Sequence, residues 1–77
     1  ESNINIAVRT YLRLFYLPKT TDRKRQELLM RICEVYYKKK NNNEASIYLS
    51  KISIDTISQD GKLLKRYQKL REQILAN

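Results

Sequence analysis

The sequence predicts an all-α protein, an antiparallel four-helix bundle that forms a single domain over residues 1–77. The chain of 77 residues has one Gly and one Pro, too few turn-forming residues for an all-β protein. Apolar side chains recur at steps of three and four along four segments, which short polar stretches separate. A single cysteine, Cys33, excludes an intramolecular disulfide, so packing alone must hold the helices together.

The first two helices are predicted over residues 3–17 and 22–40. Pro18 ends the first, because proline cannot continue the helical hydrogen bonding. Thr21 or Asp22 is the expected N-cap of the second, since either side chain can accept a bond from a free backbone N–H. The apolar stripes of these helices supply the first part of the expected core: Val8, Leu12, Phe15, Leu28, Ile32, Val35 and Tyr36.

The third and fourth helices are predicted over residues 44–59 and 62–76. The third is rich in β-branched residues, which favour strands, but a lone strand would have no partner in this chain. Asn43 is its expected N-cap, and Asp60-Gly61 is the expected turn before the fourth helix. These two helices complete the expected core with Leu49, Ile52, Leu63, Tyr67, Leu70 and Ile74.

The sequence has no recognisable catalytic or metal-binding pattern, so we expect neither enzymatic activity nor a cofactor. Histidine is absent, which removes the commonest general base and metal ligand. Cys33 is expected to be a small buried residue, and the serines near the third helix lack the glycines of a nucleophile elbow. The scattered carboxylates are expected in surface ion pairs with nearby lysines and arginines.

Positive charge is the strongest functional signal in the sequence. The 16 Lys and Arg against 8 Asp and Glu give a net charge of +8. This excess favours binding to nucleic-acid phosphates or to an anionic membrane face, with a solvated basic surface that binds neither as an equal alternative. The charge is spread over the second and fourth helices, which argues against a single recognition helix.

Membrane insertion and secretion are not predicted from the residues present. No run approaches the roughly 20 apolar residues that span a bilayer. The first residues also lack the charged and then apolar pattern of a signal peptide. Because residue 1 is Glu and not Met, we expect the natural chain to begin upstream.

The C-terminal half resembles a known family. Across residues 36–73 the pattern resembles the immunity proteins of pediocin-like (class IIa) bacteriocins from Gram-positive bacteria. These proteins show a basic helix end, a polar loop, a Leu-Ser-Arg-like step, an Asp-Gly turn and a Leu-rich basic final helix. The residues that carry the resemblance are Tyr37-Lys38-Lys39-Lys40-Asn41, Ala45-Ser46, Leu49-Ser50-Lys51, Ile54, Ile57, Asp60-Gly61 and Gln68-Lys69-Leu70.

The resemblance implies a cytoplasmic, non-catalytic four-helix bundle, partly associated with the inner face of the membrane, that protects a bacteriocin producer. The implied partner is the membrane receptor of the bacteriocin, the mannose phosphotransferase permease, with bacteriocin bound. The immunity protein would associate with this complex and block the pore, with weak membrane-surface association and no nucleic-acid partner. In the family the C-terminal half governs specificity, which implies partner-binding residues on the fourth helix: Lys62, Lys65, Arg66, Lys69 and Arg71.

Two other hypotheses remain open at the sequence level. The main alternative is a small basic helical protein that binds nucleic acid or acts as a regulator. Dispersed basic residues and the absence of a helix-turn-helix glycine pattern argue against it. A peripheral membrane helix bundle is the third hypothesis, and the lack of a helix with a large aromatic apolar face argues against that one.

Overall fold

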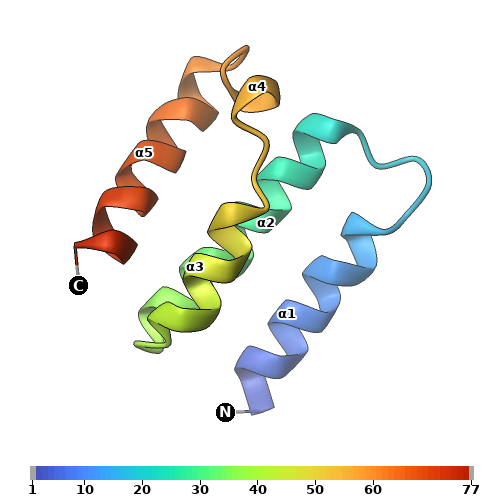
Figure 1. The fold of residues 1–77 in the computed structure, drawn as a ribbon. Coiled ribbons are helices and arrows are strands. Elements are labelled where there is room, and N and C mark those ends of the chain that lie inside the picture. The colour runs from blue at the N-terminus through green and yellow to red at the C-terminus, as the bar shows by residue number, and fades with distance from the viewer. Residues whose placement is uncertain (1, 77) are drawn as a thin grey trace.

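The computed structural model describes residues 2–76, although the side chains of residues 2–4 lie outside the description. Within this range the protein is all-helical, with no strand (Figure 1). The all-α prediction is confirmed, but the described chain forms five helices where four were predicted. They are α1 (Ser2–Phe15), α2 (Asp22–Lys38), α3 (Asn42–Ser50), α4 (Ile54–Ile57) and α5 (Gly61–Leu75).

α2 is the central helix of the fold. Its backbone lies close to that of every other helix, whereas α2 is the only helix of the described residues to which the backbone of α1 lies close. α1 and α2 run in opposite directions, and so do α2 and α3 (Figure 1). In a closed four-helix bundle the first and last helices would also pack together, but here α1 and α5 lie on opposite flanks of α3 (Figure 1). The molecule is accordingly flat, with extents of 32 × 29 × 16 Å.

The buried apolar residues fall into two groups around α2. Val8 of α1 and Leu28 and Ile32 of α2 are buried but lie outside the main cluster. Leu28 and Ile32 are four residues apart and share one face of α2, so we assign this group to the contact with α1. The main cluster joins α2 to the rest of the chain and contains Leu29, Met30, Cys33, Ala45, Leu49, Ile52, Ile57, Leu63, Leu70 and Ile74.

The residues expected in the core divide by depth. Those that are buried are Val8, Leu28, Ile32, Leu49, Ile52, Leu63, Leu70 and Ile74. Those that are half-buried at its edge are Leu12, Phe15, Val35, Tyr36 and Tyr67. The two tyrosines pack against the main cluster while their hydroxyls favour the boundary with water. The sequence did not single out Met30 and Ala45, which are fully buried.

α1 and α2 both end before the predicted positions, at Phe15 instead of 17 and at Lys38 instead of 40. At the end of α1, the Arg25 guanidinium donates hydrogen bonds to the backbone carbonyls of Phe15 (3.1 Å) and Leu17 (3.4 Å). At the end of α2, Lys40 adopts a left-handed conformation with φ 61°. The N–H groups of Lys40 and Asn41 then bond back to the carbonyls of the last turn, which is the Schellman arrangement.

The prediction of one continuous third helix over 44–59 is wrong, because the chain leaves the helix between α3 and α4. Ser53 is extended (φ −84°, ψ 108°), and its N–H donates to Gln26 Oε1 of α2 at 2.7 Å. The Ser53 side chain then caps α4 by accepting from the N–H of Thr56 at 3.4 Å. A bond to another helix therefore replaces the helical hydrogen bond that Ser53 would otherwise make.

The capping residues partly match the expected ones. Thr21 is the N-cap of α2 as predicted, and its hydroxyl accepts from the N–H of Lys24 at 3.1 Å. Asn41, and not Asn43, caps α3. Asp60 caps α5, so Gly61 is the first residue of that helix and has no positive φ.

We expect Gln26→Ala to lower the free energy of unfolding by about 1–3 kcal/mol, because it leaves the Ser53 N–H without its acceptor. Chemical denaturation followed by circular dichroism measures this loss. Gln68→Ala is the matched control, since Gln68 is exposed on α5 and its removal should cost less than about 0.5 kcal/mol. Equal losses in the two variants would show that the Gln26 bond does not stabilise the break.

Candidate partner-binding site

The described residues hold no group of His, Cys, Asp and Glu side chains that could bind a metal ion. Cys33 is fully buried in the main cluster. Desolvation, with a smaller contribution from the nearby Glu34 charge, raises the pKa of the Cys33 thiol to about 12. The thiol is therefore protonated near neutral pH and is a poor nucleophile. None of the described helices combines the length and the apolar character that crossing a bilayer requires.

Ion pairs involve only a minority of the positive residues in the described chain. The pairs are Arg23 with Asp60, Lys24 with Glu27, Arg25 with Asp22, and Arg66 with Glu34. The pairs of Lys24 and Arg25 lie within α2, whereas those of Arg23 and Arg66 join α2 to the start and the middle of α5. The lysines near the end of α2 and along α5 make no ion pair with a described residue. Their positive charge is therefore available to bind a partner.

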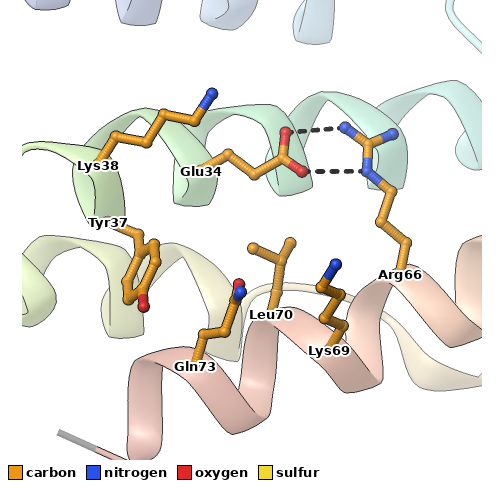
Figure 2. Close-up of a pocket in the computed structure, with 7 residues that line it drawn as sticks. All are labelled: Glu34, Tyr37, Lys38, Arg66, Lys69, Leu70 and Gln73. Carbon is orange, nitrogen blue, oxygen red and sulfur yellow. Dashed lines mark hydrogen bonds and ion pairs between the residues drawn. The ribbon is translucent and has the colours of Figure 1, made fainter.

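A groove lies between α2 and α5 and has a volume of about 330 Å³ (Figure 2). The two helices run in the same direction here, so residues of increasing number face each other in order (Figures 1 and 2). Spacings of three and four residues bring the lining side chains onto the facing sides of the two helices. They are Glu34, Tyr37 and Lys38 of α2, with Arg66, Lys69, Leu70 and Gln73 of α5.

The Glu34–Arg66 ion pair bridges the two helices at one end of this groove. The Arg66 guanidinium donates two hydrogen bonds to the Glu34 carboxylate, Nη2 to Oε1 at 2.8 Å and Nε to Oε2 at 3.2 Å. Hydrogen bonding to Glu34 raises the pKa of Arg66 against the opposing effect of desolvation. Both side chains are half-buried, and the two-bond geometry fixes their orientation.

The structure brings together only part of the expected partner-binding set. Arg66 and Lys69 both line the groove, whereas Lys62, Lys65 and Arg71 are exposed on α5 outside it. Arg66 differs from the other four residues, because its guanidinium is half-buried and bound to Glu34. Lys69 remains exposed and makes no ion pair with a described residue.

Five groove residues lie outside the expected partner-binding set, namely Glu34, Tyr37, Lys38, Leu70 and Gln73. Their signal in the sequence is the helical spacing: Lys38 follows Glu34 by four residues, and Gln73 follows Lys69 by four. This spacing places each pair on one face of its own helix. It does not reveal that the two faces meet, which depends on the packing of α2 with α5.

Comparison with protein-family models, with curated proteins and with solved structures finds no match to this chain.

Because the Cys33 thiol is buried with a pKa of about 12, we expect the folded protein to react very slowly with Ellman's reagent at mildly alkaline pH. In denaturant the thiol regains an ordinary pKa and access to the reagent, so the reaction should accelerate by at least about a hundredfold. Release of thionitrobenzoate measures both rates on the same sample. Comparable rates in the folded and denatured protein would contradict the burial of Cys33.

Proposed function

We propose that this protein is a bacteriocin immunity protein. In this proposal it acts at the cytoplasmic face of the membrane and protects a Gram-positive producer from a pediocin-like bacteriocin. It associates with the membrane receptor once bacteriocin is bound there, and it blocks the pore. The action needs protein contact and no chemical step, in keeping with the buried, protonated state of Cys33.

The observation that carries this proposal is the resemblance over residues 36–73, supported by the structural role of its parts. The lysines of the basic stretch lie where α2 ends, and Asn41 of the polar loop caps α3. Leu49 of the Leu-Ser-Lys step is buried in the main cluster. Asp60 and Gly61 form the capped start of α5. Each quoted motif therefore coincides with a helix boundary or a core contact.

The helices can be related to the family fold within the same proposal. α1, α2, α3 and α5 would correspond to the four helices of an antiparallel bundle, and α4 would be a short additional turn before the last of them. The partner-binding residues would then be the exposed cations of α5: Lys62, Lys65, Lys69 and Arg71. Arg66 would act indirectly, because it holds α5 to α2 through Glu34.

A survival assay tests this function. The chain is expressed in a sensitive Gram-positive strain, and a panel of pediocin-like bacteriocins is titrated against it. We expect a higher inhibitory concentration for one or a few of them. Leu49→Asp is the negative control, because an unpaired charge in the main cluster should unfold the protein and abolish protection.

The opposite outcome of that assay is equally informative. If the folded, expressed chain protects against none of the bacteriocins, the immunity proposal is wrong. The net charge of +8 would then favour the alternative of a nucleic-acid-binding or regulatory protein. Salt-dependent binding to DNA is the measurement that would support this alternative.

An exchange of segments locates specificity within the chain. Replacing residues 44–77 with those of a related immunity protein should switch which bacteriocin is resisted, because the implied partner-binding residues lie in α5. The reciprocal chimera, with residues 1–43 exchanged, should keep the original resistance. Specificity that follows residues 1–43 would contradict the assignment to α5.

A further inference from the structure

We propose that the groove between α2 and α5 binds an acidic, amphipathic segment of a partner protein, with carboxylates on both sides of an apolar side chain. The inference deepens the proposed function and rests on it in one respect, that the protein acts by protein contact. It assigns a chemistry to the partner that the resemblance does not supply. It also places the contact in a groove shared by two helices instead of on the exposed face of α5.

Both helices of the groove contribute a lysine that makes no ion pair with a described residue. Lys38 of α2 and Lys69 of α5 line the groove from opposite helices, and neither makes an ion pair with a described residue. In Figure 2 Lys69 lies beside Leu70 on α5, and Lys38 extends along α2 with its ammonium group directed away from α5. Two separated ammonium groups fit two carboxylates on one segment better than they fit a single small anion. A partner with negative charge at both positions is therefore complementary.

The groove also has an apolar part. Tyr37 is half-buried and supplies most of this apolar surface, while Leu70, with 4% of its surface exposed, forms the floor. The Tyr37 ring can cover an apolar side chain of the partner, while the lysines of the lining remain in contact with water. The groove thus presents a small apolar surface within a positive rim.

The charged pair at the end of the groove limits which anions can bind there. Arg66 is the one arginine of the lining, and its guanidinium donates two hydrogen bonds to Glu34. Arginine in a two-bond geometry recognises carboxylate and phosphate alike, so its engagement here leaves the two lysines as the groups that can bind an anion. Glu34 would add repulsion against closely spaced phosphates. A carboxylate-bearing peptide fits this lining better than a nucleic-acid backbone does.

The groove also has a continuation that would lengthen the contact. A neighbouring hollow shares Tyr37 and Lys38 and adds Lys40 from the turn after α2 and Asn42 from the start of α3. Lys40 is exposed and makes no ion pair with a described residue. The positive surface therefore runs from the middle of α5 across α2 to the start of α3. A partner segment of several residues could contact the whole of this surface.

The test measures binding of labelled peptides to the purified protein by fluorescence anisotropy. The probe is a short acetylated and amidated peptide with a Leu and with a Glu one helical turn to each side of it. A second peptide has Gln in place of both Glu residues, and a third ligand is single-stranded oligothymidine. We expect the Glu peptide to bind, with affinity falling as salt is added.

A pair of matched double variants locates the binding site. Lys38→Glu with Lys69→Glu should weaken binding of the Glu peptide by about tenfold or more, because both attractive charges become repulsive. The control is Arg9→Glu with Lys39→Glu, which makes the same change in net charge at exposed positions outside the groove. We expect the control to change affinity by less than about threefold. Circular dichroism verifies that both variants remain folded.

Several outcomes would overturn the inference. These are no binding of the Glu peptide, equal binding of the Gln peptide, or equal losses in the two double variants. Tighter binding of oligothymidine that the groove variant abolishes would assign the groove to nucleic acid instead. The survival assay separates this inference from the proposed function. Protection without peptide binding refutes the groove alone, and groove-dependent peptide binding without protection refutes the immunity function alone.

Discussion

Burial of α2 on two sides is the constraint on which the rest of the structure depends. The helix supplies Leu28 and Ile32 outside the main cluster and Leu29, Met30 and Cys33 within it, so neither α1 nor α5 needs to contact the other. Four of its polar residues bind other elements, and two of these four bind α5 or its N-cap. These contacts are Arg23 with Asp60 before α5, Arg25 with the carbonyl of Phe15 at the end of α1, Gln26 with the N–H of Ser53 before α4, and Glu34 with Arg66 in the middle of α5.

The same contacts explain how much of the fold could be predicted from the sequence. Helical spacing, Pro18 and the Thr21 cap are local signals, and they predicted the all-α class and the start of α2 correctly. Two of the errors lie where a side chain of α2 contacts the chain beyond a helix end, Arg25 after α1 and Gln26 between α3 and α4. The early end of α2 itself follows from the left-handed conformation of Lys40. Apolar periodicity continues through Ile52, Ile54 and Ile57, so nothing within the segment 44–59 indicates that Gln26 accepts the N–H of Ser53. Tertiary hydrogen bonding therefore overrides the local pattern.

The candidate site was also only partly predictable from the sequence. The cations that α5 contributes could be predicted, because basic residues on the polar face of an amphipathic helix are evident in its spacing. Which of these cations are free to bind a partner could not be predicted. Arg66 and Lys69 are three residues apart and look equivalent in the sequence, yet Arg66 bonds to Glu34 while Lys69 makes no ion pair with a described residue. The difference arises only when α5 lies beside α2, and that arrangement also brings Lys38 into the groove.

Arginine and lysine have different roles in these contacts. The side chains that join separate elements are arginines, namely Arg23, Arg25 and Arg66, whose planar guanidinium groups can make several directed hydrogen bonds. The free cations of the groove are lysines, which are strongly hydrated and lose rotamer entropy when they bind. Contacts made by such lysines are individually weak and are screened by salt. Binding at the groove would thus become strong only when several acidic groups are presented together. In the proposed function, that condition would restrict the protein to an assembled partner and keep it away from isolated acidic peptides at low concentration.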